Sequence, residues 1–301
     1  MKILITGHKG FVGKHFVSRL EKDNEIVGLD IKDGLEFDCR NFFREQCQSS
    51  NPQHFDLVIH LAAIVGGRET IENEPLSVAT DLSVDSEMFN WALKTHQGKI
   101  IYYSSSAAYP TKLQERGKKL RLREEWLDLN DVHNPDFTYG WTKLTGEMLA
   151  NFARKQGLNV YVFRPFSGYG EDQDLTYPFP SFIRRFEEKA DPFVIWGDGK
   201  QVRDFIHIED IVSATLKAVE LDIQKPINLG LGRPTDFNEL AQIIFKIGGW
   251  RPKQIHRLID KPVGVDYRCS DNSFMLTFYK PQITLEEGIE RALKAKRDYS
   301  V

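Results

Sequence analysis

The feature that most restricts the fold is an alternation of short apolar runs, rich in β-branched residues, with amphipathic helical stretches. Residues 3–5 form the first run, apolar side chains recur at helical spacing over 11–20, and 25–29 form the next run. Further runs occur at 56–60, 99–103 and 159–163, separated by helical patterns at 84–93 and 139–155. This rhythm predicts an α/β fold whose parallel sheet is covered on both faces.

The pattern changes after Arg164 and Pro165, where a loop rich in Gly, Tyr, Asp and Pro begins. Strand-like runs return at 202–211 and 226–229, so we expect the chain to leave the sheet and later rejoin it. A length of 301 residues allows one large domain or two modest ones. The predicted domains are 1–165 with about 202–230, and a smaller C-terminal region made of 166–201 and 231–301.

Composition and charge restrict the partners and the compartment. Forty Lys and Arg against 43 Asp and Glu give a net charge of −3, which argues against a nucleic-acid partner. No run approaches the roughly 18 apolar residues of a membrane span. Cys39, Cys47 and Cys269 lack the number and spacing of a disulfide framework or a metal site. Because Met1 is followed directly by an apolar strand and not by a cationic leader, we expect a cytoplasmic protein.

Three glycines follow the first predicted strand in the pattern Gly7-x-x-Gly10-x-x-Gly13 and open the first helix. Gly7 would permit the tight turn, Gly10 would let the backbone approach a pyrophosphate, and Gly13 would let the helix pack against the strand. The same glycines also suit an ordinary strand-to-helix turn. Their position between a strand and a helix favours dinucleotide binding.

Asp30 ends the second predicted strand, 17 positions after Gly13. A carboxylate there can accept hydrogen bonds from an adenosine ribose and would repel a 2′-phosphate. This favours NAD over NADP, although Lys32 would offset part of the repulsion. The alternative is a turn aspartate that binds no ligand.

Tyr139 and Lys143 lie four residues apart at the start of a predicted helix, so both face the same side. An ammonium group beside a phenol favours the phenolate form and makes tyrosine a better base near neutral pH. Taken alone, such a pair is more typical of an ordinary helix surface.

In combination, these segments resemble the extended short-chain dehydrogenase/reductase family, in its branch of nucleotide-sugar epimerases, dehydratases and ketoreductases. The matching segments are Gly7-x-x-Gly10-x-x-Gly13, Asp30, His60-Leu61-Ala62-Ala63, Ser104-Ser105-Ser106 and Tyr139-x-x-x-Lys143. Later segments match in family order: Arg164-Pro165-Phe166, Gly168-Tyr169-Gly170, Val202-Arg203-Asp204-Phe205 and Asn228-Leu229-Gly230. The resemblance covers nearly the whole chain. It implies a Rossmann-type doubly wound sheet that binds NAD, and a smaller region that binds a nucleotide-diphosphate sugar.

The resemblance also implies roles for individual residues. Ser105, four residues before Tyr109, would orient a sugar hydroxyl or ketone, Tyr139 would move its proton, and Lys143 would hold the nicotinamide ribose. Further NAD contacts are implied for Phe11, Val12, Asp38, Cys39, Leu61, Ala62, Ala63, Pro165 and Phe166. Substrate contacts are implied for Gly67, Arg68, Ser106, Ser167, Trp196, Arg203 and Arg268. Asp38 equally suits a helix N-cap, Trp196 suits a packing residue, and Arg203 and Arg268 would bind the diphosphate.

Two positions restrict the reaction. Family dehydratases carry an acid just after the catalytic Ser or Thr, where this chain has Ser106 and Ala107, and Ala107 replaces the cysteine of the 3,5-epimerases. An alanine methyl group cannot move a proton, so dehydration and 3,5-epimerisation are disfavoured. Oxidation and re-reduction at one sugar carbon remain, most simply C4 epimerisation. The alternatives are a ketoreductase or dehydrogenase with the same triad and, less favoured, a non-catalytic NAD-binding sensor.

Substrate type and assembly are implied only by the resemblance. Residues 63–67, Tyr109-Pro110 and 196–199 are more similar to GDP-sugar members than to the UDP-galactose type, and the prediction covers both GDP- and UDP-sugars. Family members pair through the helices around Val84 and Tyr139, which predicts a homodimer. The chain departs from the family pattern with Asp81 in place of Asn, Val84 in place of Gly and Ser167 in place of Asn.

Overall fold

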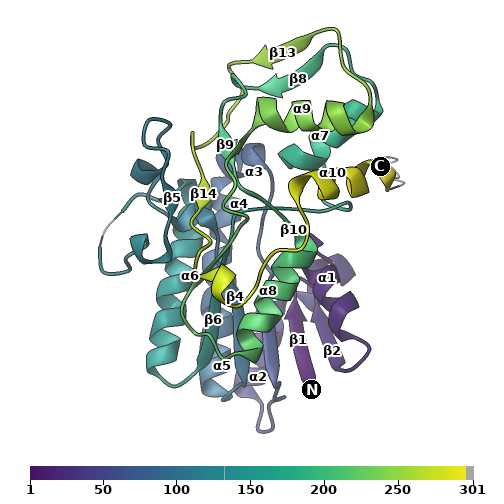
Figure 1. The fold of residues 1–301 in the computed structure, drawn as a ribbon. Coiled ribbons are helices and arrows are strands. Elements are labelled where there is room, and N and C mark those ends of the chain that lie inside the picture. Colours follow the sequence, from purple (N-terminus) through teal and green to yellow (C-terminus); the bar gives the residue numbers. More distant parts are fainter. Residues whose placement is uncertain (132, 296–301) are drawn as a thin grey trace.

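The computed structural model describes residues 1–131 and 133–295 and is built on one six-stranded sheet with helices on both faces (Figure 1). Every neighbouring pair of strands in this sheet is parallel. In spatial order the strands are β11 (Ile227–Leu229), β6 (Asn159–Pro165), β4 (Lys99–Tyr103), β3 (Leu57–His60), β1 (Lys2–Thr6) and β2 (Glu25–Leu29). The predicted α/β, doubly wound parallel sheet is confirmed.

The strand order reverses direction between β1 and β3. The chain runs from β1 outward to β2 and then crosses to β3 on the other side of β1. In open parallel sheets, ligands bind beyond the carboxyl ends of the strands at such a reversal. The carboxyl ends of β1 and β3, at Thr6 and His60, therefore mark the expected site.

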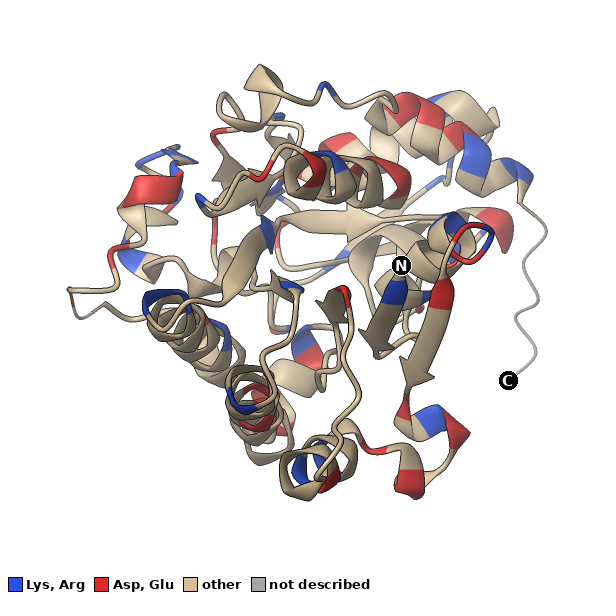
Figure 2. Cartoon of the chain, turned by 90° about the horizontal axis from the view of Figure 1, so that it is seen from below, with Lys and Arg blue, Asp and Glu red and all other residues tan. Residues whose placement is uncertain are grey.

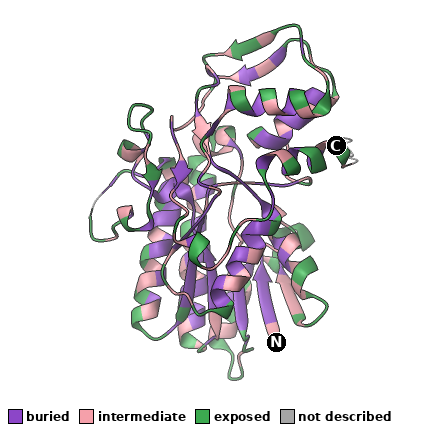
Figure 3. Ribbon diagram, in the orientation of Figure 1, coloured by how far each residue is buried: buried purple, intermediate pink, exposed green. Residues whose placement is uncertain are grey.

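The two faces of the sheet are covered by different helices because successive strand side chains point to opposite sides. Ile3 and Ile5 of β1 pack with α1 (Phe11–Leu20) and α8 (Ile208–Glu220). Leu4 packs on the other face with α2 (Cys39–Gln48), α5 (Asp81–Lys94) and α6 (Phe137–Lys155). Figure 3 shows the central strands as the most continuously buried elements.

The C-terminal region has a separate core next to the sheet. Phe182, Phe193, Phe245 and Ile289 belong to this core, which carries no strand of the main sheet. Its elements are α7 (Pro178–Glu187), β8 (Phe193–Trp196), α9 (Phe237–Gly248), β13 (Ile255–Leu258) and α10 (Leu285–Lys294). The smaller elements elsewhere are α3 (Arg68–Asn73), α4 (Pro75–Ala79), β5 (Arg121–Leu122), β7 (Ser167–Tyr169), β9 (Val202–Arg203), β10 (Phe205–His207), β12 (Thr235–Asp236) and β14 (Cys269–Ser270).

The strand expected over 202–211 is wrong in extent and in pairing. β9 pairs with β12 and β10 pairs with β7, and α8 begins at Ile208. The His207 Nδ1 atom accepts the Glu209 N–H at 3.2 Å and so caps this helix. The apolar side chains of Ile208, Ile211 and Val212 recur at helical spacing and continue the run of β10, which is why the run resembles a single strand.

Charged residues of both signs are interspersed along the helices seen from below in Figure 2. Among the described residues, no helix combines the length and the apolar character needed to cross a membrane. The same residues contain no group of three or more His, Cys, Asp and Glu side chains arranged to hold a metal ion.

Candidate active site

The turn between β1 and α1 is a cradle that only glycines can form. Gly7 has a φ of +71°, and a Cβ atom on Gly13 would lie 2.2 Å from the Gly7 carbonyl oxygen. Gly10 precedes the first turn of α1, which contains Phe11 and Val12. The first N–H groups of a helix and its dipole favour an anion, so this cradle fits the pyrophosphate of a dinucleotide.

Asp30 lies directly after β2 and faces this cradle. Its carboxylate accepts the backbone N–H groups of Lys9 and Lys32, each at 2.9 Å, and the residue is buried. Lys9 forms an ion pair with Asp33, and the His8 Nε2 atom lies 3.4 Å from the same carboxylate. Because a second acid neutralises the nearby Lys9, this corner suits ribose hydroxyls better than a 2′-phosphate.

Asp38 and Cys39 lie at the start of α2. Asp38 is the N-cap and accepts the Arg40 N–H at 2.9 Å, as the alternative interpretation of this residue predicts. The hydrogen bond from the Arg40 guanidinium outweighs burial and lowers the pKa of Asp38. Burial raises the pKa of the Cys39 thiol to about 12, so this side chain remains neutral. Whether either residue contacts adenine stays a prediction.

The segment after β3 lies against the glycine cradle. The Ala62 N–H donates to Thr6 Oγ1 at 3.2 Å, and a Cβ on Gly7 would lie 2.9 Å from the Ala62 nitrogen. Leu61 and Ala63 flank this contact. At the end of β6, Pro165 is followed by Phe166, whose ring centroid is 6.3 Å from that of Tyr109. These predicted cofactor residues therefore share the carboxyl edge of the sheet.

Ser105, Tyr139 and Lys143 meet at the same edge. Ser105 follows β4 and caps a short 3-10 turn, Ser106–Ala108, by accepting the Ala107 N–H at 3.1 Å. The first turn of α6 lies directly on that turn, since the Asp136 N–H donates to the Ala107 carbonyl at 3.0 Å. The Lys143 Nζ atom lies 5.8 Å from the centroid of the Tyr139 ring.

Two features hold α6 in this position. A Cβ on Gly140 would lie 2.6 Å from the Ala107 carbonyl oxygen, so a glycine is needed for the close approach. Glu147, one turn after Lys143, is buried and accepts hydrogen bonds from the guanidinium of Arg164 on β6 at 2.7 and 2.8 Å. A buried ion pair of this geometry ties α6 to the sheet.

Lys143 is almost completely buried beside two acids of α5. Burial by itself would lower the pKa of Lys143, but Asp85, Tyr139 and Asp81 outweigh it, so the pKa is raised. Lys143 is therefore an ammonium ion at neutral pH, which is the state that the proposed chemistry needs.

The three predicted arginines gather next to the start of α6. Arg68 and Arg268 each donate to a different oxygen of Asp136, both at 2.8 Å. Burial would raise the pKa of Asp136, but these two guanidinium groups outweigh it and lower the pKa. Arg203 donates to the carbonyls of Val202, Val263 and Val265 at 2.7–2.9 Å.

Arg203 has no carboxylate partner among the described residues. Burial, followed by the positive charge of Arg268, lowers the pKa of the Arg203 guanidinium well below its ordinary value. Asp136 and Asp266 oppose this shift, but no ion pair between Arg203 and either acid is formed, so a part of its positive charge can attract a bound anion. The cluster therefore has the chemistry of an anion site.

The other predicted substrate residues surround this cluster at varying distance. Ser106 is buried in the turn after Ser105, and Ser167 donates its N–H to the Asp204 carbonyl, next to Arg203. A Cβ on Gly67 would lie 2.2 Å from the Thr176 carbonyl oxygen. Trp196 ends β8, which pairs with β13, and the Lys261 Nζ atom lies 5.0 Å from the centroid of its ring.

Sequence reasoning missed two residues that organise the arginines. Asp136, three residues before Tyr139, bridges Arg68 and Arg268, and Gln114 accepts a hydrogen bond from Arg268 Nε at 2.6 Å. Gln114 is itself buried, and its amide donates to the Tyr109 and Pro110 carbonyls. An acid one turn from a candidate base is a signal that could have been used, whereas nothing local marks Gln114.

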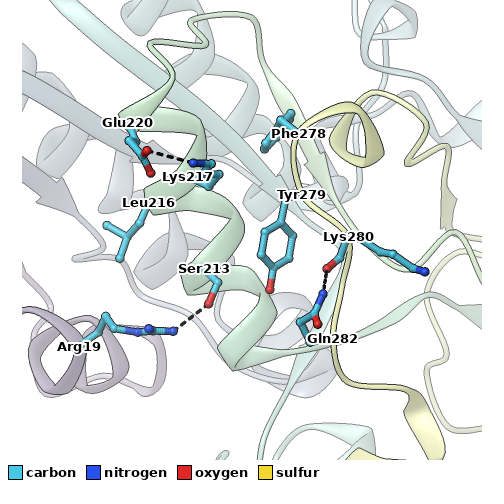
Figure 4. Close-up of a pocket in the computed structure, with 9 residues that line it drawn as sticks. All are labelled: Arg19, Ser213, Leu216, Lys217, Glu220, Phe278, Tyr279, Lys280 and Gln282. Atoms are coloured by element: carbon cyan, nitrogen blue, oxygen red, sulfur yellow. Dashed lines mark hydrogen bonds and ion pairs between the residues drawn. The ribbon is translucent and has the colours of Figure 1, made fainter.

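A surface cavity of about 390 Å³ lies elsewhere, between α1, α8 and residues 278–282 (Figure 4). Arg19 on its wall donates to Ser213 at 2.9 Å. None of the predicted site residues lines it. The candidate active site is therefore defined by converging side chains and backbone, and not by this cavity.

Comparison with known proteins agrees with this geometry. Residues 3–230 match the model of the NAD dependent epimerase/dehydratase family. The chain belongs to this family. The predicted family and its NAD cofactor are thereby confirmed, and the chain is an enzyme of the nucleotide-sugar epimerase/dehydratase type.

Individual relatives cover nearly the whole chain. A dTDP-4-dehydro-6-deoxy-D-allose reductase from Streptomyces sp. is 28% identical, over 97% of this chain and 95% of its own. GDP-mannose 3,5-epimerase 1 from Oryza sativa subsp. indica is 28% identical, over 96% and 80%. The crystal structure of a UDP-glucuronic acid 4-epimerase from Bacillus cereus, in complex with UDP-glucuronic acid and NAD, has a TM-score of 0.79 at 25% identity and covers 97% and 98%.

Proposed function

We propose that this chain is an NAD-dependent C4-epimerase of a nucleotide-diphosphate hexose, with a GDP- or UDP-sugar as substrate. The observation that carries the proposal is the convergence of Ser105, Tyr139 and Lys143 at the carboxyl edge of the sheet. This edge adjoins both the glycine cradle and the arginine cluster. One site can thus hold a dinucleotide and an anionic sugar nucleotide together.

In this reaction, three side chains of the protein would have separate roles. Ser105 would orient the sugar hydroxyl by hydrogen bonding, and the Tyr139 phenol would accept and return its proton. Lys143 stays charged and favours the ionised phenol. NAD, when bound, supplies the hydride acceptor and donor that the sugar carbon needs. Gly7, Gly10 and Gly13 would hold its pyrophosphate, with Asp30 on the ribose.

The arginine cluster would hold the substrate diphosphate. Arg203 is part-buried and forms no ion pair with an acid of the described residues. Arg268, which Gln114 and Asp136 hold in place, adds a second guanidinium group of the kind that suits phosphate oxygens. A diphosphate anchored there would keep the oxidised sugar bound while it turns its other face to the redox centre. Re-reduction on that face would invert C4.

The site lacks the groups that other reactions of the family require. Ser106 and Ala107 are both buried directly after Ser105 and carry neither an acid nor a thiol. Removal of a C5 proton, which dehydration and 3,5-epimerisation both need, therefore has no base at this position. The likeness to a GDP-mannose 3,5-epimerase supports the fold and not that reaction.

A second candidate is a nucleotide-sugar 4-ketoreductase or dehydrogenase. It uses the same three catalytic groups, and the likeness to a dTDP-4-dehydro-6-deoxy-D-allose reductase favours it. The corner formed by Asp30, Asp33 and the paired Lys9 suits NAD, which favours the epimerase. A non-catalytic NAD sensor is less favoured because the triad is complete.

Product analysis tests the proposal. Purified protein, without added cofactor, is incubated with GDP- and UDP-hexoses, and the sugars are followed by NMR. Inversion at C4 without net oxidation or reduction is expected. A requirement for stoichiometric NADH or NADPH would identify a reductase, and reduction of bound cofactor without any product would support the sensor.

We also propose the predicted division of labour between the domains. Residues 1–165 and about 202–230 would bind NAD, since β11 lies in the main sheet. Residues 166–201 and 231–301 would bind the nucleotide sugar, and 296–301 lie outside the described residues. The separate core of α7, α9 and α10 supports this division. Limited proteolysis with and without each ligand would test it.

A homodimer remains part of the proposal. The outer face of α6 exposes Trp141, Met148 and Phe152, with exposed fractions of 45%, 38% and 52%, and Leu82 of α5 is 40% exposed. Apolar residues along adjacent helices suit pairing with a second copy. Trp141→Lys combined with Phe152→Lys should give a monomer in analytical ultracentrifugation. Unchanged sedimentation would exclude this face.

We propose a cytoplasmic location. Cys39, Cys47 and Cys269 are all free thiols, as suits a reducing compartment. Burial raises the pKa of Cys269 far above its ordinary value, so this thiol is unreactive. Cell fractionation with an antibody to the chain would test the location.

A further inference from the structure

Asp81 begins α5 and is completely buried. One carboxylate oxygen, Oδ1, accepts the Ile64 N–H at 2.6 Å, in the loop that follows β3. The other oxygen, Oδ2, is buried and has no hydrogen-bond partner among the described residues. A buried acceptor without a partner is costly, so the position of Asp81, one helical turn before a second buried acid, needs an explanation.

Asp85 lies one turn further along α5 and is also buried. Its Oδ2 atom accepts a hydrogen bond from the Tyr102 hydroxyl at 2.5 Å. Its Oδ1 atom is hydrogen-bonded to the His60 Nε2 atom at 3.2 Å. A Cβ on Gly146 would lie 2.6 Å from Asp85 Oδ2 and 1.7 Å from the Tyr102 hydroxyl. The Lys143 Nζ atom lies 5.7 Å from the centroid of the Tyr102 ring, whose hydroxyl donates to Asp85, so Asp85 and Lys143 both lie beside Tyr102 in one buried cluster.

This cluster has two carboxylates, on Asp81 and Asp85, for the single ammonium group of Lys143. Lys143 is a single ammonium group that interacts with both Asp81 and Asp85. Burial raises the pKa of Asp81 to about 6, against the attraction of Lys143, so Asp81 is ionised at neutral and alkaline pH. The titratable groups that face the cluster are Tyr139, Lys143 and Glu147 of α6, Asp81 and Asp85 of α5, His60 of β3, Tyr102 of β4 and Cys39 of α2.

We propose that Asp81 is a positioning residue that, together with Asp85, forms a buried acidic pair behind Lys143 and limits the positive charge that Lys143 presents to Tyr139. The pair keeps Lys143 charged and in place. It also opposes formation of a negative phenolate nearby. The inference rests on the proposed function, in which Tyr139 carries the proton. The residue concerned, Asp81, is also a position at which this chain differs from the family pattern, which has asparagine there.

The variant Asp81→Asn removes the negative charge of this side chain and keeps nearly the same shape. The amide oxygen can still accept the Ile64 N–H, while one negative charge is removed. The acid limb of the kcat–pH profile, which would report ionisation of Tyr139, should then move to lower pH by about one unit. Glu87→Gln is the matched control, since Glu87 lies on the same helix and pairs with Arg44 on the outer side. This control should leave the limb in place.

Three outcomes would overturn the proposal in this experiment: an unshifted limb in Asp81→Asn, a shift to higher pH, or an equal shift in Glu87→Gln. A lower kcat with an unshifted limb would mean that Asp81 only supports the fold. Thermal melting and NAD binding establish that each variant is folded.

A second measurement needs no turnover. In the substrate-free protein, carbon NMR follows the titration of the Asp81 carboxyl group in wild type and in Lys143→Met. Loss of the ammonium group should raise the pH of this titration by about one unit or more. An unchanged titration would overturn the proposal even if the enzyme were an epimerase. A clear shift without any epimerase activity would leave the acidic pair in place and refute the proposed function alone.

Discussion

The proposed cofactor side of the site is made mostly of backbone, whereas the proposed substrate side is made of charged side chains. On the cofactor side, Gly7 and Gly13 leave a cradle into which no Cβ would fit, and Asp30 is held by two backbone N–H groups. On the substrate side, Arg68, Arg203 and Arg268 come from separate segments and surround Asp136.

The two sides are therefore maintained by different physical factors. The cradle depends on the absence of side chains within a few residues, so a single methyl group should disturb it. The arginine cluster depends on charge balance between distant segments, with Asp136 neutralising part of its positive charge. Changes on one side should therefore leave binding on the other side largely intact.

The largest effect is expected where the two sides meet. Tyr139→Phe removes only the phenolic oxygen, so kcat should fall roughly 100- to 10,000-fold, as for loss of a general acid–base group. Affinities for NAD and for the nucleotide sugar should change little. Steady-state kinetics and calorimetry measure both. If kcat stayed within about tenfold of wild type, Tyr139 would not be the proton carrier.

A change confined to the substrate side comes next. Arg268→Met should raise the KM for the nucleotide sugar about 10- to 100-fold, because a guanidinium–phosphate fork is lost. NAD affinity should be unchanged, and Arg268→Lys should lie between the two, since it keeps the charge without the fork. Weaker NAD binding with an unchanged KM would contradict the division into two sides.

Gly13→Ala tests the cofactor side. Its methyl group would lie 2.2 Å from the Gly7 carbonyl oxygen, so α1 must move. We expect a loss of about 1–3 kcal/mol in the free energy of unfolding, together with weaker NAD binding. Gly117→Ala is the control, because nothing lies within 4 Å of its added Cβ. Equal effects of the two variants in urea unfolding and NAD titration would show that the cradle is not needed.

The smallest expected effect concerns the charge balance of the arginines. Asp136→Asn should lower the free energy of unfolding by about 1–2 kcal/mol at neutral pH. The pKa of Asp136 is held below its ordinary value of 3.8, so its contribution is present above that pH and is lost as the pH falls through the lowered value. The free energies of unfolding of the two proteins, measured in urea, should therefore converge as the pH falls through this lowered value. A constant difference down to that pH would show that ionised Asp136 is not what stabilises the cluster.

The structure separates what local patterns could predict from what they could not. The glycine turn and the pair Tyr139 and Lys143 depend on spacings of three or four residues, and the structure brings each together as expected. The run at 202–211 was misassigned because alternating and helical spacing coincide where β10 leads into α8. The contacts of Gln114 and Asp136 with Arg268 could not be predicted, because Arg268 lies more than 130 positions away in the sequence.

The α/β alternation, the glycine cradle and the helix that carries Tyr139 and Lys143 can be predicted from local sequence, because each follows from side-chain size and periodicity over a few residues. Three relations appear only in the folded chain: Asp136 bridges two arginines, Arg203 forms no ion pair among the described residues, and the charges of Asp81 and Asp85 act on Lys143. These relations depend on desolvation and on charges from distant segments, and both exist only once the chain has packed.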